Sequence, residues 1–191
     1  MQGIEGLIQK YAHKNLQSNT INMKPMLIFP TEAEAASIVV ARGDLDIRIC
    51  GVGVVETALS VAKIIESEHP QAIILCGIAG AYDRSLCIGD LVAVSVEQTS
   101  TLPSVYQKSY SASYSLPLPE VISNTVMAVG AESCGAQVEN MEGAALFALC
   151  AEHKVPCAQI RAISNYTDDP RSAWDIPAAL DSLSKTINTL F

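Results

Sequence analysis

The chain has 191 residues, 49% of them hydrophobic, and carries a formal net charge of −8. This length and hydrophobic content fit one domain with a sizeable core. The sequence has 12 Lys and Arg and 20 Asp and Glu. The resulting negative charge is the wrong sign for a protein that binds the phosphate backbone of a nucleic acid through counterion release. We therefore expect no nucleic acid among its partners.

The six cysteines and three histidines form no metal-binding or disulfide pattern. Most cysteines stand in apolar runs and none forms a C-x-x-C pair, which is typical of small core residues in a reducing compartment. The N-terminus lacks the apolar segment of a signal peptide, and there is no run of about 18 apolar residues to cross a bilayer. We expect a cytoplasmic protein with no metal, no cofactor and no membrane partner.

The first 22 residues differ from the rest of the chain. Ile4, Leu7, Ile8 and Tyr11 recur at helical spacing, which predicts a short amphipathic helix before a polar linker. We interpret residues 1–22 as an appendage and residues 23–191 as the compact, catalytic domain.

From Met26 onward, apolar runs alternate with helical periods in βαβαβ order. Strands are predicted at 26–29, 47–50 and 72–76, and helices at 34–40 and about 55–68. One face of the second helix carries Val55, Leu59, Ala62 and Ile65.

The second half continues in the same way. Strands are predicted at 91–96, 121–129 and 157–163, a helix at 141–153 and a closing helix through Ile176, Leu183 and Leu190; the Ser-, Tyr- and Pro-rich stretch 99–119 is predicted to be an irregular loop. Continuously apolar strands belong in a sheet covered on both faces. A three-layer α/β domain follows.

Two glycine pairs follow predicted strands. Gly51-Val52-Gly53 fails the dinucleotide fingerprint, because Glu56 stands where its third glycine belongs and would repel a pyrophosphate. It is interpreted as a tight turn from strand to helix. The stretch 77–81, Gly-Ile-Ala-Gly-Ala, is predicted to be a turn at the carboxyl end of a strand, where open α/β sheets bind ligands.

Two carboxylates are candidates for chemistry. Glu34 follows the first strand and could face the crevice, although a solvated helix start is the plainer interpretation. Glu142 precedes the small apolar residues Gly143, Ala144 and Ala145, where a carboxylate needs partners. Two ribose hydroxyls, each donating to one carboxylate oxygen, would suit it.

The run Arg161-Ala162-Ile163-Ser164-Asn165 places polar groups at the carboxyl end of a strong strand, again on the expected ligand side. A strand that ends in Ser-Asn because those residues form turns is the plainer alternative.

Residues 26–181 resemble the nucleosidases of the nucleoside phosphorylase superfamily. Five landmarks occur in order: Thr31-Glu32-Ala33-Glu34, Gly51-Val52-Gly53, Gly77-Ile78-Ala79-Gly80, Glu139 to Ala145, and Arg161 to Asn165. Within the superfamily the futalosine hydrolases, menaquinone-pathway enzymes, resemble it most, through the run 139–145 and through Arg161–Asn165 leading to Trp174-Asp175-Ile176-Pro177. The resemblance implies an α/β/α fold with a central mixed sheet, and a homodimer.

The resemblance also implies roles. Glu34 matches the carboxylate that activates water, Met141 and Glu142 match the ribose-binding pair, and Asn165 matches the residue that contacts the purine. Further substrate-binding positions are Ile78, Ala79, Gly80, Val126, Arg161 and Ser164. Breaking an N-ribosidic bond gives the sugar positive charge and the base negative charge, so carboxylates and donors are required.

Asn165 bears on which class of purine base the site would recognise. The adenosine-type nucleosidases have Asp at this position, whereas Asn offers a fixed donor and a fixed acceptor, which suit a 6-oxo group and a protonated N7. An unpaired polar contact in the wrong complex costs enough to discriminate. We therefore predict hydrolysis of a 6-oxopurine nucleoside, with futalosine, which yields hypoxanthine and the dehypoxanthinyl sugar, as the first candidate.

The chain departs from the family between Val96 and Ser123, where relatives have a longer stretch that helps to close the pocket. Tyr106, Tyr110 or Tyr114 could replace the aromatic residue that stacks on the purine. Three alternatives stay open: a methylthioadenosine/S-adenosylhomocysteine nucleosidase, a nucleoside phosphorylase and a non-catalytic nucleoside-binding paralogue. A phosphorylase would need basic and hydroxyl groups near the glycine turns, and residues 77–82 contain no Ser, Thr, Arg or Lys.

Overall fold

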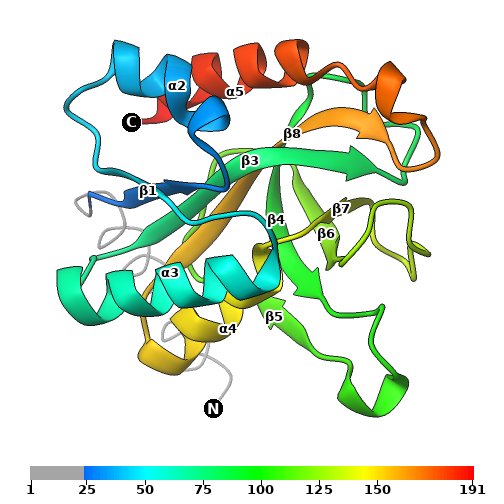
Figure 1. Ribbon diagram of the computed structural model, residues 1–191, viewed down its shortest axis with the longest axis horizontal. Helices are drawn as coiled ribbons and strands as arrows, with labels where there is room; N and C mark the ends of the chain where they lie inside the picture. Colours follow the sequence, from blue (N-terminus) through cyan, green and yellow to red (C-terminus); the bar gives the residue numbers. More distant parts are fainter. Residues whose placement is uncertain (1–23) are drawn as a thin grey trace, which may run out of the picture.

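The computed structural model describes residues 24–191, which form three layers (Figure 1). The predicted appendage, residues 1–22, lies outside the described residues. One face of the sheet is covered by α2 (Glu32–Ala41) and α5 (Ile176–Leu190), and the other by α3 (Gly53–Glu68) and α4 (Gly143–His153). The predicted three-layer α/β/α fold is confirmed. None of the described helices is long and apolar enough to span a membrane.

The middle layer is one mixed sheet with eight strands in the described part of the chain. These are β1 (Met26–Phe29), β2 (Ile47–Ile49), β3 (Ile73–Ala81), β4 (Leu91–Gln98), β5 (Ser109–Ser111), β6 (Glu120–Thr125), β7 (Val138–Asn140) and β8 (Cys157–Tyr166). β3 runs parallel to β1 and β8, whereas β7 and β3, and β4 and β8, pair antiparallel. The two short 3₁₀ helices are η1 (Ser104–Tyr106) and η2 (Arg171–Ala173).

Five of the strands close into a ring. β3 pairs with β8, β8 with β4, β4 with β6, β6 with β7, and β7 returns to the end of β3. At this end Gly80 stands opposite Asn165 on one side and Glu139 on the other. The register therefore brings together polar residues that lie far apart in the sequence.

Each face of the sheet has its own hydrophobic core. One core contains Val61, Ile64 and Ile65 of α3 with Leu146, Phe147 and Cys150 of α4. The other contains Ala35 and Ile38 of α2 with Ala179, Leu183 and Ile187 of α5. Burial of these apolar side chains fixes the helices on the sheet and so positions their first turns at the strand ends.

The buried face of α3 differs from the predicted one. Ile65 of the predicted face is buried, but Val55 and Leu59 are 62% and 66% exposed. The other buried residues of α3 are Thr57, Val61 and Ile64. Both stripes are apolar and recur at helical spacing, so periodicity alone did not distinguish the stripe that faces α4 from the one that faces solvent.

The prediction of a turn over residues 77–81 was wrong, because β3 continues through Ala81. Its glycines instead allow close approach. A Cβ atom on Gly77 would lie 2.8 Å from Arg161 Nη1 and 3.0 Å from Glu34 Oε1. Other elements also differ from the prediction. β6 ends at Thr125, the predicted loop 99–119 contains η1 and β5, β7 was not predicted, and α4 begins at Gly143.

Candidate active site

A cavity of about 360 Å³ opens where the ends of β3, β7 and β8 meet the first turns of α2 and α5. All ten predicted site residues line it: Glu34, Ile78, Ala79, Gly80, Val126, Met141, Glu142, Arg161, Ser164 and Asn165. They come from five separate segments of the chain, so the fold assembles them into one place.

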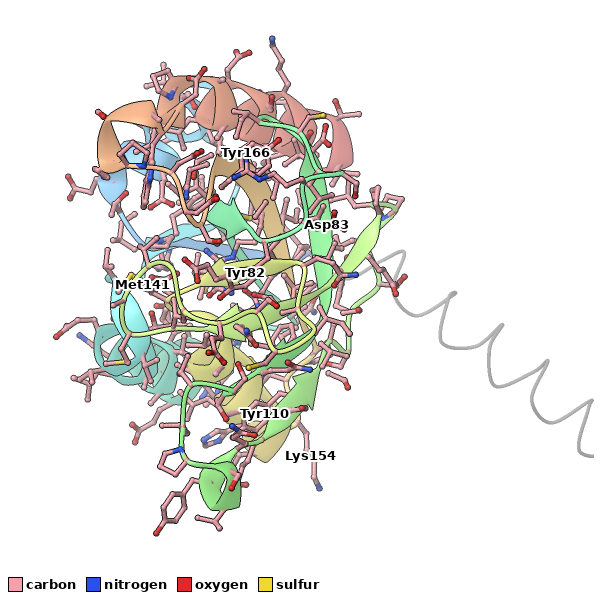
Figure 2. The ribbon with its side chains drawn as sticks, turned by 90° about the vertical axis from the view of Figure 1, so that its right-hand side faces the viewer. Tyr82, Asp83, Tyr110, Met141, Lys154 and Tyr166 are labelled. Carbon is pink, nitrogen blue, oxygen red and sulfur yellow. The ribbon has the colours of Figure 1, made fainter. Side chains whose placement is uncertain are left out.

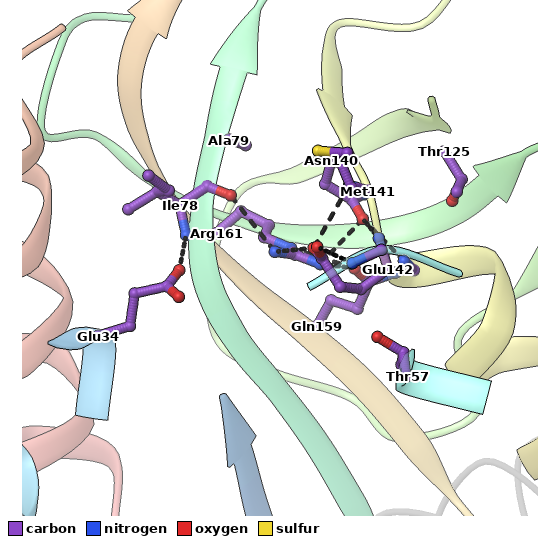
Figure 3. Close-up of polar contacts among 12 residues, drawn as sticks. Glu34, Thr57, Ile78, Ala79, Thr125, Asn140, Met141, Glu142, Gln159 and Arg161 are labelled. Atoms are coloured by element: carbon purple, nitrogen blue, oxygen red, sulfur yellow. Dashed lines mark hydrogen bonds and ion pairs between the residues drawn. The ribbon is translucent and has the colours of Figure 1, made fainter. Parts of the chain in front are cut away.

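Glu34 occupies the first turn of α2, where Thr31 is the N-cap. The Thr31 hydroxyl accepts from the Glu34 backbone N–H at 3.2 Å and donates to Glu34 Oε2 at 2.7 Å. The other oxygen, Oε1, accepts from the Ile78 backbone N–H at 3.2 Å (Figure 3). The carboxyl group is buried, not solvated, and this burial raises its pKa while the Thr31 hydrogen bond acts against the rise.

Glu142 is buried just before α4 and already has protein partners. Oε1 accepts from the Gly53 backbone N–H at 3.0 Å. Oε2 accepts from Met141 N–H and from Arg161 Nη1, both at 3.3 Å. A carboxylate offers about four acceptor positions. One position therefore remains on Oε1, and the contact between Oε2 and the Met141 N–H is long enough to be exchanged for a ligand hydroxyl.

Arg161 is fully buried on β8 and each of its five N–H groups has an acceptor. Nε and Nη2 donate to Gln159 Oε1, Nη2 also to Asn140 Oδ1, and Nη1 to Ile78 O and to Glu142. Figure 3 shows these contacts converging on the guanidinium from both sides. Arg161 therefore holds the site together and has no free donor for a ligand.

Asn165 lies at the end of β8, with its amide held at both ends. Ser164 Oγ donates to Oδ1 at 2.8 Å, and Nδ2 donates to the Tyr166 carbonyl at 2.9 Å. Since a carbonyl only accepts, the group beside it must be the NH₂, which fixes the orientation of the amide. One N–H and one lone pair remain unused.

A further buried carboxyl group, that of Glu97 in β4, lies beside the cavity-lining residues. Oε1 accepts from Thr125 Oγ1 at 2.9 Å, and Oε2 accepts from Asn140 Nδ2 at 2.9 Å and Gln159 Nε2 at 2.8 Å. A Cβ atom on Gly143 would collide with Glu97 Oε2, so glycine is required at the start of α4. Glu97 was not predicted as a site residue, although an acidic residue within an apolar strand was the available signal.

Glu139 anchors the segment between β6 and β7 at the cavity. Its Oε2 accepts from Tyr82 Oη at 2.6 Å, and its Oε1 accepts from the Gly130 backbone N–H at 2.8 Å. Burial and the adjacent carboxylate raise the pKa of Tyr82, which keeps its hydroxyl a donor. The segment also contributes Val126 and Val129 to the cavity wall.

Arg171 and Trp174 also line the cavity. The Arg171 guanidinium stacks 4.3 Å from the Trp174 ring centroid, and within residues 24–191 it makes no ion pair. Trp174 belongs to one of the runs that resemble the futalosine hydrolases, but neither residue was predicted to be a site residue.

None of the three candidate tyrosines is among the described residues that line the cavity. Tyr106 is exposed, and Tyr110 and Tyr114 pack against the two hydrophobic cores. Figure 2 shows Tyr110 well separated from Met141. The aromatic residue at this cavity is instead Trp174.

The arrangement suits acid–base chemistry on a polar ligand. One wall presents a buried carboxyl group, Glu34, and another presents Glu142 and Met141, with the Asn165 amide at the end of β8. Among residues 24–191, no group of three His, Cys, Asp or Glu side chains is placed to hold a metal ion.

Comparisons with known proteins identify the fold. Residues 117–191 match the family model of the phosphorylase superfamily. No curated protein matches the sequence significantly. The chain has the fold of the phosphorylase superfamily.

Solved structures of this superfamily superpose on this chain along nearly their whole length. The native futalosine hydrolase of Helicobacter pylori superposes with a TM-score of 0.76 at 16% identity, over 89% of this chain and 97% of that one. The Campylobacter jejuni 5'-methylthioadenosine/S-adenosyl homocysteine nucleosidase gives 0.73 at 18% identity, over 87% and 96%. A putative nucleosidase of the same type from Francisella philomiragia gives 0.77 at 20%, over 88% and 98%. The predicted resemblance to this superfamily is confirmed in the fold.

Proposed function

We propose that the protein is a purine nucleoside N-glycosidase that hydrolyses the N-ribosidic bond. The observation that carries this proposal is the placement of Glu34, Glu142 and Asn165 around one cavity. Both the futalosine hydrolase and the methylthioadenosine nucleosidase that share the fold are enzymes of this reaction class.

In the proposed reaction Glu34 accepts a proton from a water molecule that attacks the anomeric carbon. Its buried position and raised pKa make it a stronger base than an exposed glutamate. Glu142 holds the ribose hydroxyls through the free position on Oε1 and in place of its long contact with Met141 N–H. The sugar gains positive charge in the transition state, which the nearby carboxylate stabilises.

We propose a 6-oxopurine as the leaving base. The fixed Asn165 amide keeps one N–H for the 6-oxo group and one lone pair for a protonated N7. Futalosine, cleaved to hypoxanthine in menaquinone biosynthesis, is the first candidate substrate. Methylthioadenosine and S-adenosylhomocysteine are the second.

A phosphorylase is the alternative that a specific observation favours. Arg171 lines the cavity as a cation without an ion pair in the described part of the chain, and phosphate would be its natural partner. Hydrolysis is preferred because the other cavity arginine, Arg161, has every N–H engaged by the protein.

We further propose a cytoplasmic homodimer with residues 23–191 as the catalytic domain. Val52, Val55 and Leu59 are exposed apolar residues on or beside α3, and Val52 also lines the cavity. Exposed apolar groups of this kind are common at subunit interfaces.

Release of free base from futalosine, inosine, adenosine and methylthioadenosine, each with and without inorganic phosphate, tests the proposal. We expect release of hypoxanthine from the 6-oxo substrates without phosphate. In Glu34→Gln we expect kcat to be lower by about 10²- to 10⁴-fold. Base release that strictly requires phosphate would establish the phosphorylase. Tight binding without release in any arm would show a non-catalytic nucleoside-binding protein.

A further inference from the structure

Glu97 is fully buried and is joined to Glu142 by a chain of hydrogen bonds. It accepts from the side-chain NH₂ groups of Asn140 and Gln159. The amide oxygens of the same two residues accept from Arg161. Arg161 in turn donates to Glu142, the carboxylate proposed to hold the ribose.

The hydrogen-bond pattern suits an ionised Glu97. Because the amide oxygens of Asn140 and Gln159 face a guanidinium, their NH₂ groups must face Glu97, and an NH₂ group only donates. Thr125 Oγ1 accepts from Ala144 N–H at 2.8 Å and so directs its own hydrogen to Glu97 Oε1. The pKa of Glu97 is raised above its ordinary value, chiefly by burial, and these three hydrogen bonds and Arg161 only partly offset the rise. The case for the ionised form therefore rests on the donors that surround both carboxyl oxygens.

The charges in this buried cluster do not cancel. Arg161 contributes one positive charge, and Glu142 and Glu97 contribute one negative charge each. Arg161 and Glu142 alone would be a neutral pair, so an ionised Glu97 gives this cluster of three side chains, which lies against the cavity, a net charge of about −1. In a buried site such a charge acts strongly on a ligand that becomes cationic.

We propose that Glu97 is a positioning residue that fixes Arg161 and Glu142 through Asn140 and Gln159 and makes the cavity selective for a cationic sugar. This inference rests on the proposed function, because only cleavage of the N-ribosidic bond generates such a sugar in the transition state. Glu97 itself touches no substrate.

Glu97→Gln tests the inference, because it removes the charge and preserves the shape. Its amide oxygen can accept from Asn140 and Gln159, and its NH₂ can donate to Thr125 Oγ1. The probes are two hypoxanthine nucleoside analogues, one with a protonated pyrrolidine ring and one with a neutral carbocycle in place of ribose. We expect the affinity for the cationic analogue to fall about tenfold or more, whereas the affinity for the neutral analogue should change less than about twofold. We also expect kcat to fall with little change in KM.

Glu120→Gln is the matched control, because it removes one negative charge from an exposed position. We expect it to leave both affinities unchanged. Equal losses for the two analogues in Glu97→Gln would mean a merely structural role, and no loss for either would also overturn the inference.

A second measurement needs no variant. It is the NMR chemical shift of the Glu97 carboxyl carbon in ¹³C-labelled wild-type protein, assigned through the neighbouring Thr125 methyl group. We expect the chemical shift of an ionised carboxylate at the assay pH. A protonated Glu97 overturns the inference. Because the analogues report binding without turnover, a wild-type protein that releases no base contradicts the proposed function alone.

Discussion

Thr31 combines two tasks in one side chain: it caps α2 and donates to the carboxylate of Glu34. A hydrogen bond to the charged form favours ionisation, so its removal raises the pKa of Glu34 further. The proposed base acts as the carboxylate, and activity is therefore lost as the pH falls through this pKa.

We predict that Thr31→Val moves the acidic limb of the kcat/KM profile to higher pH and costs about 1 kcal/mol of stability through the lost cap. Thr189→Val is the control, because its hydroxyl bonds only within α5. An unchanged acidic limb in Thr31→Val would argue that Glu34 is not the group that titrates.

Asn165 sets the class of base in the proposed function. In Asn165→Asp a carboxylate oxygen would stand beside the Tyr166 carbonyl, where only a donor is tolerated, so the new group must protonate or turn. We predict a shift in the ratio of kcat/KM from 6-oxo toward 6-amino nucleosides of roughly 10- to 100-fold. Inosine and adenosine measured in parallel check this, with exposed Asn188→Asp as the control. An unmoved ratio would remove Asn165 from base recognition.

Among the elements, β3 requires that neighbouring side chains approach its backbone closely at Gly77. Arg161 and Glu34 both lie against Gly77, and an added methyl group must displace one of them. We predict that Gly77→Ala lowers the free energy of unfolding by about 1–3 kcal/mol and reduces kcat. Urea denaturation measures the first quantity.

Gly43→Ala is the matched control, since a Cβ atom there meets nothing within 4 Å. It should leave activity unchanged. A Gly77→Ala protein as stable and active as wild type would show that Arg161 and Glu34 can shift without cost, which would contradict this prediction.

At the scale of the whole molecule, much of the fold was predictable because its strands are continuous apolar runs and its helices keep a helical period. That the ten predicted residues share one cavity was predictable because most of them stand in runs that resemble the landmarks of one superfamily, while their functional roles stay a prediction. The extension of β3 beyond Gly77 could not be predicted, because its glycines allow close packing against Arg161 and do not form a turn. Closure of the strands into a ring and the network of Glu97 depend on pairings between distant segments, which no local pattern contains.

The proposed reaction is the addition of water across an N-ribosidic bond in this cavity. The most direct test incubates the protein with futalosine, and with inosine, in phosphate-free H₂¹⁸O and analyses both products by mass spectrometry. We predict free hypoxanthine and one ¹⁸O atom on the anomeric carbon of the sugar, with both products formed about 10²- to 10⁴-fold more slowly in Glu34→Gln. An intact nucleoside after prolonged incubation, or release only when phosphate is added and recovered as a sugar phosphate, would contradict it.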